Sequence, residues 1–257
     1  MSRRTYDRAP LFEVGISLFT EANGLVDAYD IKGLHDRYRD IFPNVEKQLP
    51  IIAGTNGTPF QVTGPEDDHH RWWFVSEDGR DLVQVQTNFL GRNWRRQSLP
   101  GGDMPPYGGF SSLLTSLEDC WGRLTASITD AGRDMPEISR VEVFYDNMLP
   151  YGDGVRIRDV LEGIALGTPG PVSNFQLAWS ESLPNSASGH LQIEARAVHA
   201  TAPTGEQGDF IRLRFIAKDD ASTLEEALAI LNEAHATMTD RLHSLTTEAY
   251  RATWKAS

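Results

Sequence analysis

The sequence predicts an α+β protein in which one curved antiparallel sheet carries two long helices on the same face. Eight segments have the alternation, or the β-branched and aromatic content, that is typical of strands. Two segments, 110–128 and 222–254, have the apolar spacing of long amphipathic helices. The order strand, short helix, three strands, long helix occurs twice along the chain. This succession of strands and helices favours the α+β class.

The first half begins with alternating residues 10–20, in which Phe12, Val14, Ile16 and Leu18 are expected on one side. Asp30 can cap a short helix that Pro43 closes. Three strands are then expected at 60–63, 71–76 and 81–89. Asp78-Gly79 predicts a hairpin between the last two strands, because glycine accepts positive φ. A loop at 101–109 leads to the first long helix.

The second half repeats this order. A strand is expected at 138–145, a short helix around Ile157, and further strands at 172–181, 190–199 and 210–217. Ser222 and Glu225 have the spacing of a capping box at the start of the second long helix. Its predicted apolar stripe is Leu224, Leu228, Leu231, His235, Met238, Leu242, Leu245 and Ala249.

The short link at 132–137 favours one continuous domain built from two structural halves, 1–133 and 134–257. The alternative is a pair of separate small α+β domains. The order of elements resembles that of the TATA-binding-protein and helix-grip folds, a likeness of fold that carries no function.

Composition excludes several classes of function. The 257 residues carry a formal net charge of -12, which argues against broad phosphate binding, so the basic run at 92–96 is interpreted as a solvated face. Cys120 is the single cysteine, so no intrachain disulfide or cysteine-based zinc site can form; it is interpreted as a small buried hydrophobe. No apolar run reaches membrane-spanning length and the N-terminus lacks an apolar signal core, so a cytoplasmic location is expected.

A polar face of the sheet is the strongest candidate for binding. If both long helices cover one face, the other face carries a mixture of acidic, basic and amide side chains. A half-solvated antiparallel sheet with cross-strand Glu–Arg pairs would look like this, and so would a surface that recognises a protein or peptide. The predicted residues are Glu13, Ser17, Gln84, Gln86, Glu142, Gln192, Glu194, Arg196, Arg212 and Arg214.

Aromatic anchors are the second binding signal. Trp72 and Trp73 are neighbours in a predicted strand, so one of them faces outward, and Trp94 is predicted in a nearby loop. Aromatic side chains are favoured at interfaces. The alternative is that the 93–94 loop or the 101–107 loop covers the outward-facing tryptophan.

Catalytic and metal-binding motifs are not found. Asp67-Asp68-His69-His70 suggests a metal site, but neighbouring residues in a strand point to opposite faces, and no second ligand cluster completes it. His235 is interpreted as a core histidine. No GxSxG, P-loop or GxGxxG motif is present in the required context. The sequence therefore predicts no catalytic residues, no metal and no cofactor.

Three stretches resemble a sporadically distributed, functionally uncharacterised bacterial protein family of similar length. They are the Tyr-x-x-x-Pro-Leu-x-Glu-Val start at 6–14, the hairpin around Ser76-Glu77-Asp78-Gly79 with 83–86 and 93–94, and the terminal helix from Leu231 to Trp254. The resemblance supplies no catalytic residues. The patchy distribution of the family implies an association with bacterial defence or toxin–antitoxin gene neighbourhoods.

The first functional hypothesis is a non-catalytic cytoplasmic binding protein that recognises a protein partner, encoded by a neighbouring gene. The alternative is a small-molecule-binding protein or enzyme with a cavity between sheet and helices, where His235 and Cys120 would be the polar groups. Nucleic-acid binding is disfavoured by charge, no membrane contact is expected, and the sequence leaves a homo-oligomer open.

Overall fold

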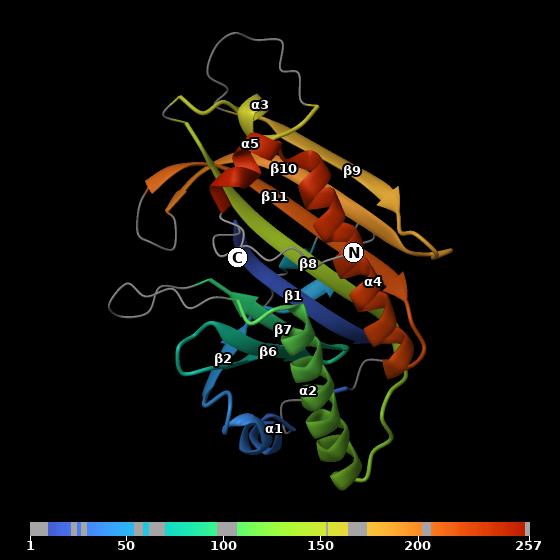
Figure 1. The fold of residues 1–257 in the computed structure, drawn as a ribbon. Coiled ribbons are helices and arrows are strands. Elements are labelled where there is room, and N and C mark those ends of the chain that lie inside the picture. The colour runs from blue at the N-terminus through green and yellow to red at the C-terminus, as the bar shows by residue number, and fades with distance from the viewer. Residues whose placement is uncertain are drawn as a thin grey trace.

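The computed structural model describes residues 10–21, 25–26, 30–53, 59–61, 70–96, 107–152, 154–163, 174–201 and 207–254. Nine of its strands form a single antiparallel sheet in the order β2-β5-β6-β7-β1-β8-β11-β10-β9 (Figure 1). The strands are β1 (Leu11–Thr20), β2 (Asn44–Gln48), β5 (Arg71–Val75), β6 (Asp81–Gln86), β7 (Phe89–Arg95), β8 (Ile138–Tyr151), β9 (Gln176–Ser182), β10 (His190–Thr201) and β11 (Gln207–Asp220). A separate two-stranded ribbon consists of β3 (Ile51–Ala53) and β4 (Pro59–Gln61). The predicted α+β class with one large antiparallel sheet is confirmed.

Both long helices lie on the same side of this sheet, in front of it in Figure 1. They are α2 (Phe110–Asp130), which contacts β7 and β1, and α4 (Leu224–Leu245), which contacts β8 and β11. The shorter helices are α1 (Asp30–Tyr38), α3 (Ile157–Val160), α5 (Glu248–Arg251) and the 3-10 turn η1 (Ala252–Trp254). Helix α1 packs against α2, where the Tyr38 hydroxyl donates to the Cys120 carbonyl at 2.8 Å.

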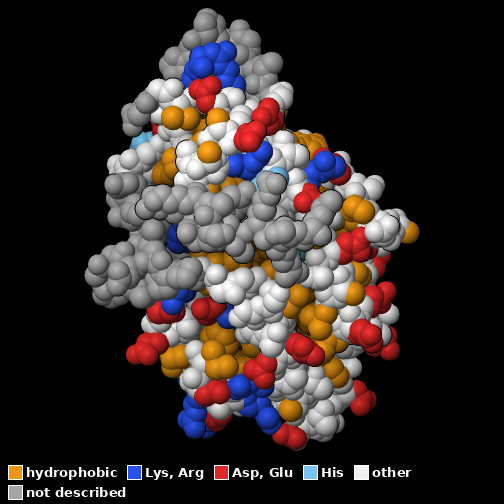
Figure 2. Space-filling model, viewed as in Figure 1, with side chains coloured by type: hydrophobic (Ala, Val, Ile, Leu, Met, Phe, Trp, Pro, Cys, Tyr) orange, Lys and Arg blue, Asp and Glu red, His pale blue; other side chains and the backbone are white. Residues whose placement is uncertain are grey.

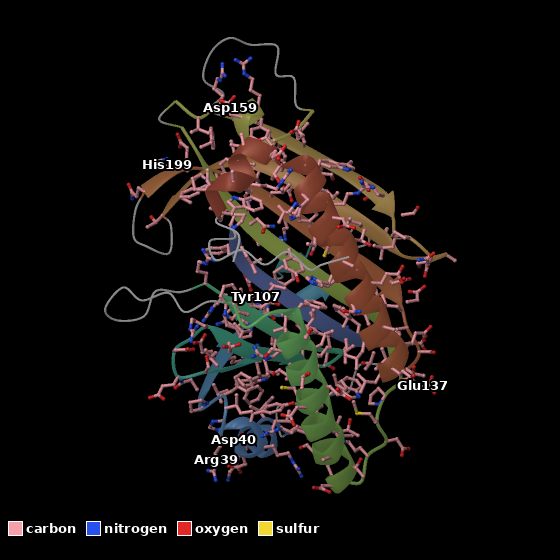
Figure 3. The ribbon with its side chains drawn as sticks, viewed as in Figure 1. Arg39, Asp40, Tyr107, Glu137, Asp159 and His199 are labelled. Carbon is pink, nitrogen blue, oxygen red and sulfur yellow. The ribbon has the colours of Figure 1, made fainter. Side chains whose placement is uncertain are left out.

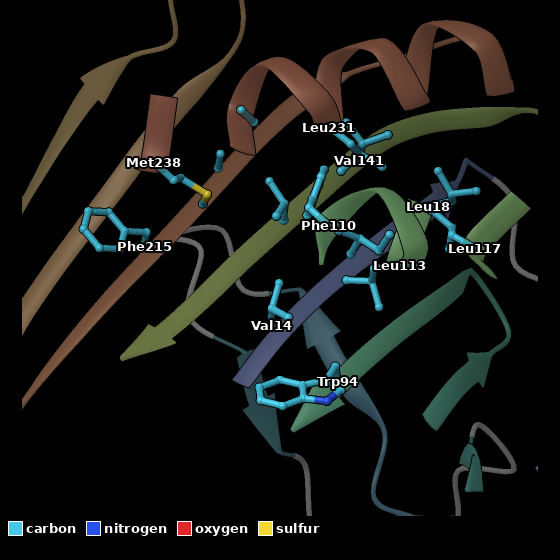
Figure 4. Packing of buried hydrophobic residues seen from close by; sticks show 14 of the residues in the cluster. Val14, Leu18, Trp94, Phe110, Leu113, Leu117, Val141, Phe215, Leu231 and Met238 are labelled. Carbon is cyan, nitrogen blue, oxygen red and sulfur yellow. The ribbon is translucent and has the colours of Figure 1, made fainter. Parts of the chain in front are cut away.

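The core fills the space between the sheet and these helices. Alternate residues of the central strands, such as Val14 and Leu18 in β1, are completely buried and meet Leu117 of α2 and Leu231 of α4 (Figure 4). The strand period of two and the helix period of 3.6 place these apolar side chains on facing surfaces. Residues of both halves of the chain belong to one continuous cluster.

The first half contains strands that were not predicted. The expected strand 81–89 is two strands, β6 and β7, joined by a turn at Thr87 and Asn88. Strand β7 was missed because the basic run at 92–96 was interpreted as a solvated face. Arg92 instead lies on the helix side of the strand and is only 6% exposed. It is stabilised there by Asp81 at 2.5 Å and by Ser116 of α2 at 2.8 Å. Edge strand β2 was missed because its side chains are mostly exposed and it lacks an apolar alternation.

The last helix is shorter than the sequence predicts. It ends at Leu245, because Thr246 is extended and forms a β-bridge with Leu161. Its N-cap is Thr223 rather than Ser222: the Thr223 side chain accepts from the Glu226 backbone, and the Glu226 carboxylate accepts from Ser222. The predicted Ser222–Glu225 capping box is therefore replaced by a cap one residue later, and Ala249 lies outside α4 and is exposed.

Candidate binding face

The cross-strand register places the predicted polar residues on one face of the sheet, opposite α2 and α4. Pairs such as Ser17 with Glu142, and Glu194 with Arg214, stand opposite each other in neighbouring strands and alternate with the core positions. We call this surface the outer face; it lies behind the sheet in Figure 1. It carries all ten residues of the sequence prediction and also Phe19, Arg71, Trp73, Asn93, Arg95, Arg140, Phe144, Asp146 and Lys218.

A chain of side-chain hydrogen bonds crosses four strands of the outer face. The Arg71 guanidinium and the Trp73 indole each donate to Gln84 Oε1 at 3.0 Å. Gln84 Nε2 donates to Asn93 Oδ1 at 2.7 Å, and Asn93 Nδ2 donates to Glu13 Oε1 at 2.9 Å. Each amide uses its oxygen toward β5 and its nitrogen toward β1, so the chain has one direction. Side-chain hydrogen-bond networks of this kind restrict the conformations of their members.

The chain ends at a pair of carboxylates in the middle of the sheet. Glu13 stands opposite Asp146 in the register of β1 and β8. Asp146 has only 2% of its side chain exposed, and Arg212 Nε donates to both of its oxygens at 2.8 Å. The hydrogen bond to Asp146 raises the pKa of Arg212. Burial raises the pKa of Glu13, and the like charge of Asp146 adds to this, although Asn93, Arg95 and Arg214 act against it.

Gly15 allows an aromatic ring to cross the centre of the outer face. A Cβ at this position would lie 2.3 Å from Phe144 Cε1 and 2.7 Å from Asn93 Nδ2. Phe144 therefore lies directly over β1, and a larger residue at Gly15 would displace both this ring and the amide that holds Glu13.

Four arginines of the outer face lie over aromatic rings. The guanidinium of Arg140 lies 4.2 Å from the centre of the Phe19 ring, and that of Arg214 lies 5.3 Å from the Phe144 ring. Arg71 and Arg95 both lie over Trp73, at 5.1 and 5.5 Å. Such cation–π contacts orient a guanidinium without occupying its N–H edge.

The three predicted aromatic anchors do not share a face. Trp73 lies on the outer face, whereas Trp72 and Trp94 point to the helix side. Trp94 belongs to β7 rather than to a loop, is 4% exposed, and packs against Tyr107 with ring centres 5.0 Å apart. A partner on the outer face would therefore meet Trp73 alone among these three residues.

His235 and Cys120 lie on the helix side and apart from the outer face. The His235 Nδ1 is 2.7 Å from the Tyr145 hydroxyl, and its ring stacks on Phe110 at 4.2 Å. Cys120 is buried, and burial raises the pKa of its thiol to about 11. This burial agrees with the interpretation of Cys120 as a small hydrophobe. Tyr107, which packs against Trp94 just before α2 begins, is labelled in Figure 3.

Three pockets are lined by described residues, and none of the three includes His235 or Cys120. A pocket of about 350 Å³ lies between the 183–188 turn and α4. One of about 750 Å³ lies where β1 and β11 end and β8 begins, and one of about 640 Å³ lies beside Arg92. Within the described ranges no cluster of histidine, cysteine and carboxylate side chains could hold a metal ion. The Asp67-Asp68-His69 part of the suggested metal motif lies outside those ranges.

The residues that connect the outer face were not predicted from the sequence. Asn93 was missed because β7 was interpreted as a loop, and Asp146 because the strand around it was expected to end at residue 145. Continuing the alternation of Glu142 by four residues would have identified Asp146. Arg71 and Phe144 had the same signal, since each stands two residues from a residue on this face.

Neither the protein-family models nor the curated proteins compared with the chain give a match. No helix in the described part of the chain is both long and apolar enough to cross a membrane.

Glu13→Gln is expected to stabilise the protein near neutral pH. Because the folded-state pKa of Glu13 lies above the ordinary 4.5, its stabilising contribution is complete below the unfolded-state pKa and is lost as pH rises through the folded-state value. Glutamine keeps the oxygen that accepts from Asn93 and removes the buried charge. Urea unfolding should therefore show a higher midpoint for the variant at about pH 7 and no gain at about pH 4. A gain that is equal at both pH values would contradict this account.

Proposed function

We propose that the protein is a non-catalytic binding protein that recognises a protein partner through the outer face. The observation that carries this proposal is the directed hydrogen-bond chain from Arg71 to Glu13, together with the Asp146–Arg212 pair that stands opposite the end of this chain. These contacts hold charged and aromatic groups in set positions on a broad surface. Preorganisation of this kind lowers the entropy cost of binding a partner.

A duplicated fold would explain the breadth of this surface, and we infer such a duplication here. The first half contributes its strands in the order β1-β7-β6-β5-β2 from the centre outward, and the second half contributes β8-β11-β10-β9, so the first half has one additional edge strand. In each half the first strand occupies the centre and the last strand before the long helix lies beside it. We propose that this layout resembles that of the TATA-binding-protein and helix-grip folds, a likeness of architecture that carries no function.

The resemblance of the sequence to a patchily distributed bacterial family supports a partner from a defence or toxin–antitoxin system. The partner would be the cytoplasmic product of a neighbouring gene. Affinity capture from the native host, with the adjacent genes intact, followed by mass spectrometry, tests this part of the proposal.

The capture experiment should compare wild type with an Arg196→Glu, Gln192→Ala variant. Both residues lie on β10 and are half-buried, and their side chains form no hydrogen bond or ion pair with the described residues. Their replacement should reduce capture of a stoichiometric partner by about tenfold or more, since reversing a charge within an interface is costly. Arg212 is unsuitable as a probe because it neutralises Asp146.

Arg39→Glu is the matched control, since Arg39 is 67% exposed and lies beside α1, far from β10 (Figure 3). Equal capture by all three proteins, or capture lost equally in the control, would show that the outer face is not the binding surface.

A further inference from the structure

The arginines of the outer face differ from the other arginines in how their charge is neutralised. Eight described arginines elsewhere form ion pairs with aspartate or glutamate, among them Arg37, Arg123 and Arg133. Among the described arginines of the outer face, only Arg212 does so. Arg140, Arg196 and Arg214 have no carboxylate of a described residue within 4 Å, although the chain as a whole carries a net charge of -12.

Two of these arginines are also held in place with donors unused. Arg140 and Arg214 lie over Phe19 and Phe144, and the Nε atom of each is buried without a hydrogen-bond acceptor. Arg71 has a third such Nε and is only 8% exposed. Because the Nε atoms are buried, an incoming acceptor would meet the two terminal nitrogens of Arg140 and Arg214, which are not among the buried atoms. The edge formed by these two nitrogens also matches the two oxygens of a carboxylate.

Resting on the proposed function, we propose that the partner presents an acidic segment to this face, with its carboxylates bound by Arg140, Arg196 and Arg214. The negative charge of the rest of the chain repels acidic proteins in general. The unpaired guanidinium groups of the outer face attract an acidic segment locally. The aromatic rings beneath two of them add apolar contact for the aliphatic parts of glutamate side chains.

The spacing of the arginines indicates an extended segment. Arg140 stands opposite Asp220 in the register of β8 and β11, and Arg214 lies six residues before Asp220 on β11. Arg140 and Arg214 are therefore roughly 20 Å apart along the strands, the length of about six extended residues. Arg196 lies on the neighbouring strand β10, opposite Arg212. One extended acidic segment of about eight residues or more can reach all three.

The fixed carboxylates favour an acidic protein segment over a nucleic acid. Glu13, Glu142 and Glu194 stand between the arginines on the same face. A phosphate backbone has a charge at every nucleotide and would approach these carboxylates, whereas the acidic side chains of a peptide can be placed at the guanidinium groups alone. Acidic side chains of this protein itself gather along the edge where α4 begins, on the helix side (Figure 2).

The test measures binding of a fluorescein-labelled Asp/Glu 12-residue peptide by anisotropy at ~50 mM salt. The comparison probes are a four-residue Asp/Glu peptide and single-stranded DNA of equal charge. The long peptide should bind at least about tenfold more tightly than either comparison probe. An Arg140→Gln, Arg214→Gln variant should lose about tenfold in affinity for the long peptide. The control Arg39→Gln, Arg158→Gln removes two exposed arginines elsewhere and should bind like wild type.

A second variant, Arg140→Lys, Arg214→Lys, keeps the charge and removes the planar fork, and it should show an intermediate affinity. It also provides the readout should the glutamine variant fail to fold, as judged by circular dichroism. No binding of the long peptide, unchanged binding by both variants, or tighter binding of DNA would each overturn the acidic-segment proposal. If capture of a native partner still depends on Arg196 and Gln192 in any of those cases, the proposed function survives; if that dependence is also lost, both proposals fail.

Discussion

An Arg212→Ala variant is expected to lose about 3 kcal/mol of unfolding free energy, the lower end of the cost of breaking a buried ion pair. The cost arises at Asp146, whose carboxyl group is 2% exposed and would lose the guanidinium that pairs with it. The lower end applies because Arg212 is itself 31% exposed, so water can reach the space beside Asp146 that the alanine leaves open. Urea unfolding monitored by circular dichroism would measure the loss.

Two further variants separate this mechanism from a simple loss of contacts. Arg196→Ala removes the arginine opposite Arg212 in the register, and it should cost less than about 0.5 kcal/mol because Arg196 has no ion pair. Adding Asp146→Asn to Arg212→Ala should restore a large part of the stability by removing the buried charge. A double variant as unstable as Arg212→Ala alone would show that packing, and not the carboxylate, determines the loss.

The architecture could be predicted because its strongest signals are periodic. Apolar residues alternate along β1, β8, β10 and β11, and they recur every three or four residues in α2 and α4. Patterns of this length identify a strand or a helix even where single residues are ambiguous. The predicted ends of strands and helices were wrong where a tertiary contact overrides the local sequence pattern. Arg92 can be buried because Asp81 neutralises its charge and the Ser116 hydroxyl accepts a hydrogen bond from its Nε. The β-bridge between Thr246 and Leu161 ends α4.

The outer face was predicted as a set of residues but not as a network. Alternation alone gives the side of the sheet for Glu13, Gln84 and Arg212. Which strands are neighbours decides that Asn93 joins Gln84 to Glu13 and that Arg212 reaches Asp146, and this order depends on long-range pairing. The sequence therefore indicates which groups face outward, while only the fold reveals which arginines lack a partner.

Phe215→Ala should be the most destabilising of the proposed variants, at about 3–5 kcal/mol. Phe215 is 1% exposed in β11, beneath α4 and close to Met238 (Figure 4). Its ring cannot be replaced without leaving a cavity, since it stands between Tyr145 of β8 and Ile193 of β10 in the register. Phe215→Leu fills most of that volume and should cost about 1 kcal/mol. Leu177→Ala on edge strand β9, where the leucine is 40% exposed, should cost less than about 0.5 kcal/mol.

The same variant tests whether the two halves unfold together. Strands β1 and β8 are paired along most of the length of β1, and one apolar cluster contains residues of both halves. A single cooperative domain therefore predicts that Phe215→Ala weakens amide-exchange protection in β6 by the same free energy as in β10. Loss of protection confined to β8–β11, with β6 unchanged, would instead show that residues 1–133 form a separate domain. The shared core and the central pairing lead us to expect equal losses in both halves.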